Sequence, residues 1–252
     1  DEIRTLAREI AAASSAAVYG RIGTSTVEFG TVTSWLVDVV NILTGNLDRP
    51  GGAMFASSPI AGAPRPARPG RGFKTGRWHS RVSGHPEALS ELPTVALAEE
   101  IETAGDGQVR ALITIAGNPV LSAPDGARLA DALAGLDFMV SVDPYLNETT
   151  RHADVILPPP PPSGVGHFDV ALSGAVVRNN ARYSPPVLPL PAGRPDECEI
   201  LSRLALFALG MGPDADPQLV DGQVIASALG KEVADPDSPV AGRTVGELTA
   251  ML

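Results

Sequence analysis

Cysteine is almost absent from this sequence, with Cys198 as its only example among 252 residues. A single thiol cannot form an internal disulfide, and it cannot supply the four thiolates that hold an iron–sulfur cluster. Basic residues are also scarce, since 19 Lys and Arg stand against 29 Asp and Glu, for a formal net charge of −10. Nonspecific nucleic-acid binding depends on neutralising phosphates with Lys and Arg, so nucleic acid is excluded as the expected partner.

Long apolar runs and targeting signals are missing as well. No stretch reaches the roughly 18 apolar residues that indicate a transmembrane helix, and the first residues lack the basic region and cleavage site of a signal peptide. We therefore expect no membrane span and a cytoplasmic location, unless a segment ahead of Asp1 carries an export signal.

Several nucleotide-binding and catalytic motifs are absent too. Neither a G-x-G-x-x-G after a strand nor a P-loop lysine motif occurs, which disfavours an unrelated α/β nucleotide-binding module. The four histidines and the scattered acids show no spacing typical of a zinc site or of a nucleophile with its base. We therefore assign no catalytic and no metal-ligating residue.

The most informative stretch that is present runs from Ala111 to Pro158. Apolar runs predict buried strands over residues 111–116, 138–142 and 155–157, and a helix is expected between the first two, from near Asp125 to Gly135. This β-α-β unit predicts an α/β fold with mainly parallel sheets and helices on both faces. Loops at the carboxyl ends of such strands line the ligand crevice. Gly117, Asn118, Pro119 and Asp143 fall in those loops.

The amino-terminal part shows a second strand and helix. We expect an amphipathic helix over residues 2–13 and a short strand over residues 16–19. Glycines at positions 20 and 23 allow a sharp turn, and Ser25-Thr26-Val27-Glu28 has the pattern of a capping box opening a helix that stops at Gly45. A strand, a glycine turn and a helix amino terminus together predict an anion site, and the alternative is a plain β-α turn.

Composition divides the chain into four parts. Residues 1–60 form the end of one α/β subdomain, residues 61–92 a connector rich in Gly, Pro and Arg, residues 93–187 a second α/β subdomain, and residues 188–252 a Pro-rich linker with helices. The segment 56–92 is expected to be less ordered than its flanks. Its basic cluster either meets a pyrophosphate or another part of the protein, or is solvated; its members are Arg65, Arg68, Arg71, Lys74, Arg77 and Arg81.

Weaker patterns complete the second half of the chain. Helices are expected over residues 94–103, 197–209, 219–229 and 244–252, and the proline run 158–162 should end the sheet. Ile200, Leu201, Leu204 and Leu209 are expected to face inward. Cys198 falls in the first turn of its helix, where it is either structural, exposed by chance, or reactive because a helix amino terminus lowers thiol pKa.

Two separated blocks of sequence resemble one known family. The first contains Ala116-Gly117-Asn118-Pro119, Val140-Ser141-Val142-Asp143, Asn147-Glu148-Thr149-Thr150 and Ala153-Asp154-Val155-Ile156-Leu157-Pro158. The second contains Tyr19-Gly20-Arg21-Ile22-Gly23-Thr24-Ser25 and Leu43-Thr44-Gly45-Asn46-Leu47-Asp48-Arg49-Pro50-Gly51-Gly52. In this order they closely resemble the molybdopterin oxidoreductases with a guanine dinucleotide cofactor, which include formate dehydrogenases, nitrate reductases and dimethyl sulfoxide reductases.

The resemblance implies an internal fragment with the fold of the second and third domains of those enzymes. The family's iron–sulfur part and its carboxyl-terminal barrel have no counterpart here, so a 4Fe-4S cluster and the metal ligand would belong to the parent protein. The implied cofactor is molybdopterin guanine dinucleotide with Mo or W. The implied partners are this pterin nucleotide, the remaining domains of the parent chain and an unidentified redox partner.

The resemblance also implies which residues touch the cofactor. Arg21, Gly23, Thr24 and Ser25 would contact one pterin nucleotide, and the other or its guanine end would meet Gly117, Asn118, Pro119, Asp143, Asn147 and Thr149. Asp143 has a chemical reason, because a carboxylate can accept two parallel hydrogen bonds from the N1–H and amino group of guanine. The alternative is an acid that caps the turn after its strand.

The implied function is the cofactor-cradling portion of an oxidoreductase that carries out two-electron chemistry at molybdenum. The alternative is a catalytically silent scaffold or electron-transfer-complex subunit of the same fold. Formate dehydrogenases of the family tend to carry an arginine shortly after the Pro-Gly-Gly stretch, where this chain has Ala56-Ser57-Ser58-Pro59. This difference counts against formate as the substrate.

Overall fold

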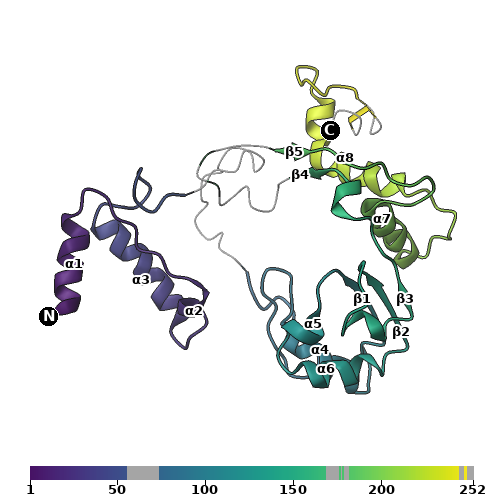
Figure 1. The fold of residues 1–252 in the computed structure, drawn as a ribbon, viewed down its shortest axis with the longest axis horizontal. Helices are drawn as coiled ribbons and strands as arrows, with labels where there is room; N and C mark the ends of the chain where they lie inside the picture. Colours follow the sequence, from purple (N-terminus) through teal and green to yellow (C-terminus); the bar gives the residue numbers. More distant parts are fainter. Residues whose placement is uncertain (56–73, 169–175, 177, 179–181, 244–246, 249–252) are drawn as a thin grey trace. The chain divides into compact units, whose positions relative to one another are not determined.

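The computed structural model describes residues 1–55, 74–168, 176, 178, 182–243 and 247–248. The chain divides into two compact units, one with Asp1–Pro66 and Phe168–Tyr183 and the other with Ala67–His167 and Ser184–Leu252. Figure 1 shows their elements in sequence colours. In the described part of the chain, no helix is long and apolar enough to cross a membrane.

In its described residues, the first unit contains three helices and no buried apolar side chain. These helices are α1 (Glu2–Ala12), the short α2 (Ile22–Ser25) and α3 (Gly30–Leu43), which appear in purple and blue in Figure 1. α1 confirms the amphipathic helix, and α3 stops as predicted before Gly45, which has a left-handed φ of 70°. Trp35 of α3 remains 62% exposed.

The predicted strand over residues 16–19 is not formed. Side-chain amides of two buried asparagines hold this segment instead of a neighbouring strand. Asn46 Oδ1 accepts the N–H of Ala16 at 3.1 Å, and Asn41 Oδ1 accepts the N–H of Val18 at 3.0 Å. Asn41 Nδ2 also donates to the Val18 carbonyl at 2.9 Å. Ala16 and Val18 are half-buried, Ala17 and Tyr19 are exposed, and within the described residues this segment has no strand partner.

The capping box predicted at Ser25 is also wrong. Ser25 is the last residue of α2, and α3 begins five residues later at Gly30 without a side-chain cap. The reason is a close approach of the backbone, because a Cβ on Gly30 would lie 2.1 Å from the Ser25 carbonyl oxygen. The tight turn between α2 and α3 therefore admits only glycine at the first position of α3.

The second unit confirms the predicted parallel sheet. Its strands β1 (Ala111–Ile115), β2 (Phe138–Val142) and β3 (Val155–Ile156) pair in the order β1-β2-β3, all parallel. In the register, Leu112 lies opposite Met139 and Thr114 opposite Ser141, and the two hydroxyls of the latter pair are 2.7 Å apart. The α/β fold class is therefore confirmed.

Helices α4 (Leu97–Glu102) and α6 (Gly126–Leu133) supply most of the core that covers one face of this sheet. The core consists of Ala98, Ile101, Leu129, Ala132, Leu133 and Met139, with Leu112 packed against it. On the opposite face Ile113 and Ile115 are 47% and 55% exposed. Among the described residues, α4 and α6 therefore pack on the face of the sheet that carries Met139.

Local signals explain the ends of these elements. Asp125 caps α6 by accepting the N–H of Arg128 at 3.4 Å, and the expected helix over 94–103 is a 3-10 turn, Thr94–Ala96, followed by α4. A one-turn helix that was not predicted, α5 (Pro119–Ser122), follows β1. β3 ends at Ile156, just before the proline run, as predicted.

The described part of the predicted connector is a loop that surrounds one buried carboxylate. Residues 56–73, including the first three arginines of the basic cluster, lie outside the described residues, whereas residues 74–92 fold around Glu87. The Glu87 carboxylate is fully buried and pairs with the Arg77 guanidinium, whose carbon lies 4.6 Å from the centre of the Trp78 ring. It also accepts the backbone N–H groups of Arg77 and Ser90.

The remaining elements are short pieces and two helices. They are two 3-10 turns, Thr150–His152 and Pro162–Gly164, a two-stranded sheet of β4 (His167–Phe168) and β5 (Tyr183–Ser184), and the helices α7 (Glu197–Ala208) and α8 (Gln218–Ala234). In α7 Ile200 is buried as predicted, and Leu206 is buried as well. Leu209, which is expected to face inward, is 75% exposed. Most of the helix predicted over 244–252 lies outside the described residues.

Candidate cofactor-binding site

The loop after β1 turns through two consecutive left-handed residues. Ala116 and Gly117 have φ values of 54° and 75°, and Ala116 still donates its N–H to the Val142 carbonyl at 2.9 Å. A Cβ on Gly117 would meet nothing within 4 Å, so its backbone borders open space. A ligand can therefore approach the main chain closely at this carboxyl end of the sheet.

The loop after β2 is held by its own polar side chains. Asp143 is 6% exposed, and its Oδ1 accepts the N–H of Tyr145 at 2.8 Å. Among the described residues, the other oxygen, Oδ2, has a single contact of 3.5 Å to Asn147 Nδ2, so it keeps acceptor capacity. Asn147 Oδ1 accepts the N–H groups of Thr149 and Thr150, each at 2.9 Å. Asp143 therefore caps the turn, as in the alternative interpretation, with one oxygen left over.

Three hydrogen bonds join the two loops. Thr149 Oγ1 lies 2.6 Å from Asn118 Oδ1 and accepts the Val120 N–H at 3.1 Å, and Asn118 Nδ2 donates to Glu148 Oε2 at 2.7 Å. The bond from Asn118 keeps the pKa of Glu148 below its ordinary value, with the residue's own backbone N–H and Arg151 as lesser causes. The six predicted residues of this unit thus lie on two connected loops.

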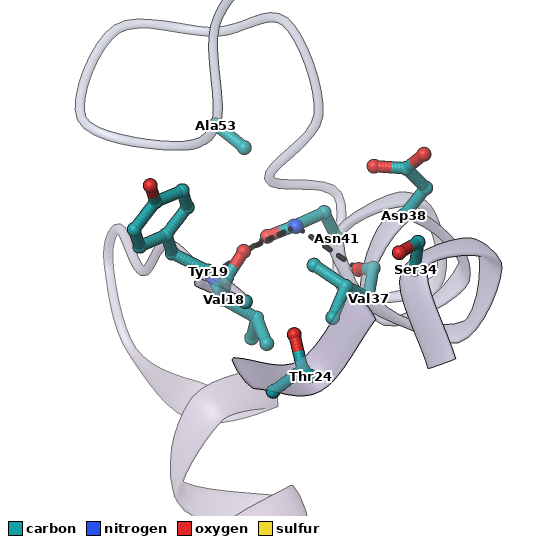
Figure 2. A pocket seen from close by; sticks show the side chains of 9 residues that line it. Val18, Tyr19, Thr24, Ser34, Val37, Asp38, Asn41 and Ala53 are labelled. Carbon is teal, nitrogen blue, oxygen red and sulfur yellow. Dashed lines mark hydrogen bonds between the residues drawn. The ribbon is translucent and has the colours of Figure 1, made fainter. Parts of the chain in front are cut away.

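Of the four predicted residues of the first unit, Gly23, Thr24 and Ser25 belong to α2 and Arg21 immediately precedes it. All four are exposed, and only Thr24 lines the neighbouring pocket of about 270 Å³ shown in Figure 2. This pocket is lined by Val18, Tyr19, Gly20, Thr24, Ser34, Val37, Asp38, Asn41 and Ala53. Its lining has one carboxylate, from Asp38, and no Lys or Arg, so its charge favours a hydrogen-bond donor over a phosphate. The predicted anion site at the Gly20 turn stays a prediction.

Gly20 has a steric role in this pocket. A Cβ there would lie 2.7 Å from Thr24 Oγ1 and 3.5 Å from Val37 Cγ2. The Thr24 hydroxyl meanwhile donates to the Arg21 carbonyl at 2.6 Å, which fixes the turn before α2. Local geometry therefore explains why glycine occurs at position 20 and threonine at position 24.

Cys198 is not an activated thiol. Although it stands in the first turn of α7, partial burial raises its pKa, and so do the carboxylates of Asp196, Asp221 and Glu197. Of the three alternatives for Cys198, the reactive thiol is therefore disfavoured, because burial and the neighbouring carboxylates both oppose the thiolate. Among the described residues, no group of three or more His, Cys, Asp or Glu side chains is placed to hold a metal ion.

Sequence comparison decides the family of the chain. A model of the molybdopterin oxidoreductase family matches residues 4–160, which is more than half of the sequence and includes both strand-end loops. The chain belongs to the molybdopterin oxidoreductase family. This agrees with the resemblance carried by the two sequence blocks.

Curated relatives match over shorter or longer parts of the chain. A nitrate reductase from Symbiobacterium thermophilum is 27% identical over 215 residues, which are 78% of this chain and 27% of that protein. The assimilatory nitrate reductase catalytic subunit of Bacillus subtilis is 39% identical over 70 residues, 27% of this chain and 10% of the relative. The F420-dependent formate dehydrogenase subunit alpha of Methanocaldococcus jannaschii is 38% identical over 64 residues, 25% of this chain and 9% of the relative. The matched regions span about a quarter or less of these relatives.

Proposed function

We propose that this chain is the cofactor-cradling central portion of a molybdopterin-dependent oxidoreductase that carries out two-electron oxygen-atom or hydride-type transfer. The observation that supports the proposal most is the connected pair of loops at the carboxyl ends of β1 and β2, in a chain of this family. We also propose that the metal ligand and a 4Fe-4S cluster come from other parts of the parent protein, because Cys198 is the only thiol here.

The residues of the two loops fit a pterin guanine dinucleotide. Open space beside Gly117 admits a ligand to the backbone, and Oδ2 of Asp143, whose contact to Asn147 is 3.5 Å long, keeps acceptor capacity for an N–H group of guanine. The rigid hydrogen-bonded loop from Asp143 to Thr150 keeps that acceptor in one place. When bound, the cofactor supplies a molybdenum or tungsten centre whose change of oxidation state carries the two electrons.

We expect Asp143→Ala in the parent protein to lower its content of guanine-bearing pterin. Unpaired donors on a buried guanine cost about 1–3 kcal/mol, or roughly 5- to 150-fold in affinity. Metal, pterin and guanine nucleotide would be measured on the purified protein beside wild type. Asp143→Asn is the sharper variant, because an amide oxygen still accepts the Tyr145 N–H while the paired acceptor is lost.

The exposed Asp106→Ala is the control and should keep full cofactor content. Full occupancy in both Asp143 variants would mean that Asp143 only caps its turn. A wild-type parent protein without molybdenum, tungsten or pterin would instead support the alternative, a catalytically silent scaffold of the same fold.

A further inference from the structure

The side-chain amide of Asn118 is held from both sides by residues of the other loop. Its Oδ1 lies 2.6 Å from the Thr149 hydroxyl, and its Nδ2 lies 2.7 Å from the Glu148 carboxylate. Thr149 is fully buried, whereas Asn118 is half-buried in the loop at the carboxyl end of β1. A buried hydroxyl thus reaches from one loop to a side chain 31 positions earlier in the sequence.

These partners dictate the orientation of the amide. Thr149 Oγ1 accepts the Val120 N–H at 3.1 Å, so its own hydrogen is available to donate, and only the oxygen of Asn118 can accept it. A carboxylate has no hydrogen to donate, so Glu148 must face the NH₂ group. Reversing the amide would place its oxygen against the Glu148 carboxylate. One N–H of Asn118 then remains without a partner among the described residues.

We infer that Thr149 and Glu148 are positioning residues that fix Asn118 so that its remaining N–H donates to an acceptor oxygen of the bound nucleotide. Thr149 itself does not reach the ligand, because its side chain is fully buried and its one hydroxyl hydrogen is donated to Asn118. The crevice then pairs a fixed donor, Asn118, with a fixed acceptor, the Oδ2 of Asp143. This inference rests on the proposed function, since it assumes that a nucleotide occupies the crevice.

The test uses the cofactor-loaded parent protein and measures the rate at which guanine-bearing pterin is released on dilution. We expect Thr149→Val to speed release roughly 2- to 10-fold, the range for one lost hydrogen bond. Thr149→Ser keeps the hydroxyl and should restore the slow rate. Asn118→Ala should speed release at least as much as Thr149→Val does.

The double variant separates positioning from general loosening. In an Asn118→Ala background, adding Thr149→Val should leave the release rate unchanged while still lowering the melting temperature, because the Val120 N–H loses its acceptor. Fast release by Asn118→Ala but wild-type release by Thr149→Val would overturn the inference, as would additive rates in the double variant. If Asp143→Asn and Asn118→Ala both release at the wild-type rate, the proposed function itself fails.

Discussion

Glu87→Gln is expected to lower the melting temperature of the protein at pH 7 far more than a surface substitution does. The Glu87 side chain is fully buried, and its two oxygens accept the Arg77 guanidinium and the backbone N–H groups of Arg77 and Ser90. Glutamine has a similar shape, but it is neutral and turns an NH₂ group toward these donors. Removing one partner of a buried ion pair leaves the other uncompensated, which is strongly destabilising.

The pKa of Glu87 predicts how the loss of stability in Glu87→Gln depends on pH. The Arg77 hydrogen bond, opposed by burial and helped by the two backbone N–H groups, lowers the pKa of Glu87 from 4.5 to about 2. Because the folded pKa lies below the unfolded one, the stabilisation is fully present above about pH 4.5 and is lost as the pH falls toward 2. The difference in Tm between wild type and Glu87→Gln should therefore be constant near neutrality and shrink below pH 4.5.

Thermal unfolding between pH 7 and pH 3 measures this effect. Glu91→Gln is the matched control, because Glu91 lies in the same loop with an exposed side chain. It should change Tm little at any pH in this range. A Glu87→Gln difference that stays the same at pH 3 and pH 7 would show that the carboxylate charge is not what stabilises the loop.

Gly126→Ala is expected to destabilise the second unit although alanine is the better helix former. A Cβ at the first position of α6 would lie 1.9 Å from the Val120 carbonyl oxygen, so α5 and α6 would have to separate. Overpacking of this kind costs about 1–3 kcal/mol, which exceeds the roughly 1 kcal/mol gained from helix propensity. The displacement would also disturb Val120, whose N–H bonds to Thr149.

Gly230→Ala supplies the comparison, since it makes the same change inside α8 where nothing lies within 4 Å of the new Cβ. It should raise the free energy of unfolding by up to about 1 kcal/mol. Denaturant unfolding of both variants measures the two shifts. Equal shifts of the same sign would show that the contact between Gly126 and Val120 does not control the junction.

The sequence predicts most clearly the elements whose signal is local. The strands at 111–115 and 138–142 follow from continuous apolar runs, and their parallel pairing follows from the helix between them. Because parallel strands end at one edge, the sequence also predicts that Gly117 and Asp143 lie on neighbouring loops. The bond from Thr149 to Asn118 gives no local signal, since it joins residues 31 positions apart.

The elements that the sequence mispredicts depend on contacts that the residue pattern does not show. A short apolar run such as 16–19 predicts a strand only if a partner strand exists, and Asn41 and Asn46 take that place. The pattern at Ser25 resembles a helix start, but a tight turn that admits only glycine at position 30 separates α2 from α3. Buried Glu87 has no periodicity around it. Asn41 gives no such signal either, because it lies on the face of α3 opposite the apolar residues Val32, Leu36 and Leu43.

The two buried asparagines of the first unit also give the backbone of residues 16–19 one bonded edge and one open edge. Their bonds to Ala16 and Val18 fall two residues apart, the spacing at which backbone groups of a strand face one edge. Ala17 and Tyr19, which face the other edge in this pattern, have no backbone hydrogen bond within the described residues. One edge is closed by side chains, and a peptide that adds to this segment must do so from the other. The asparagines therefore prevent another strand from pairing with this segment on their side.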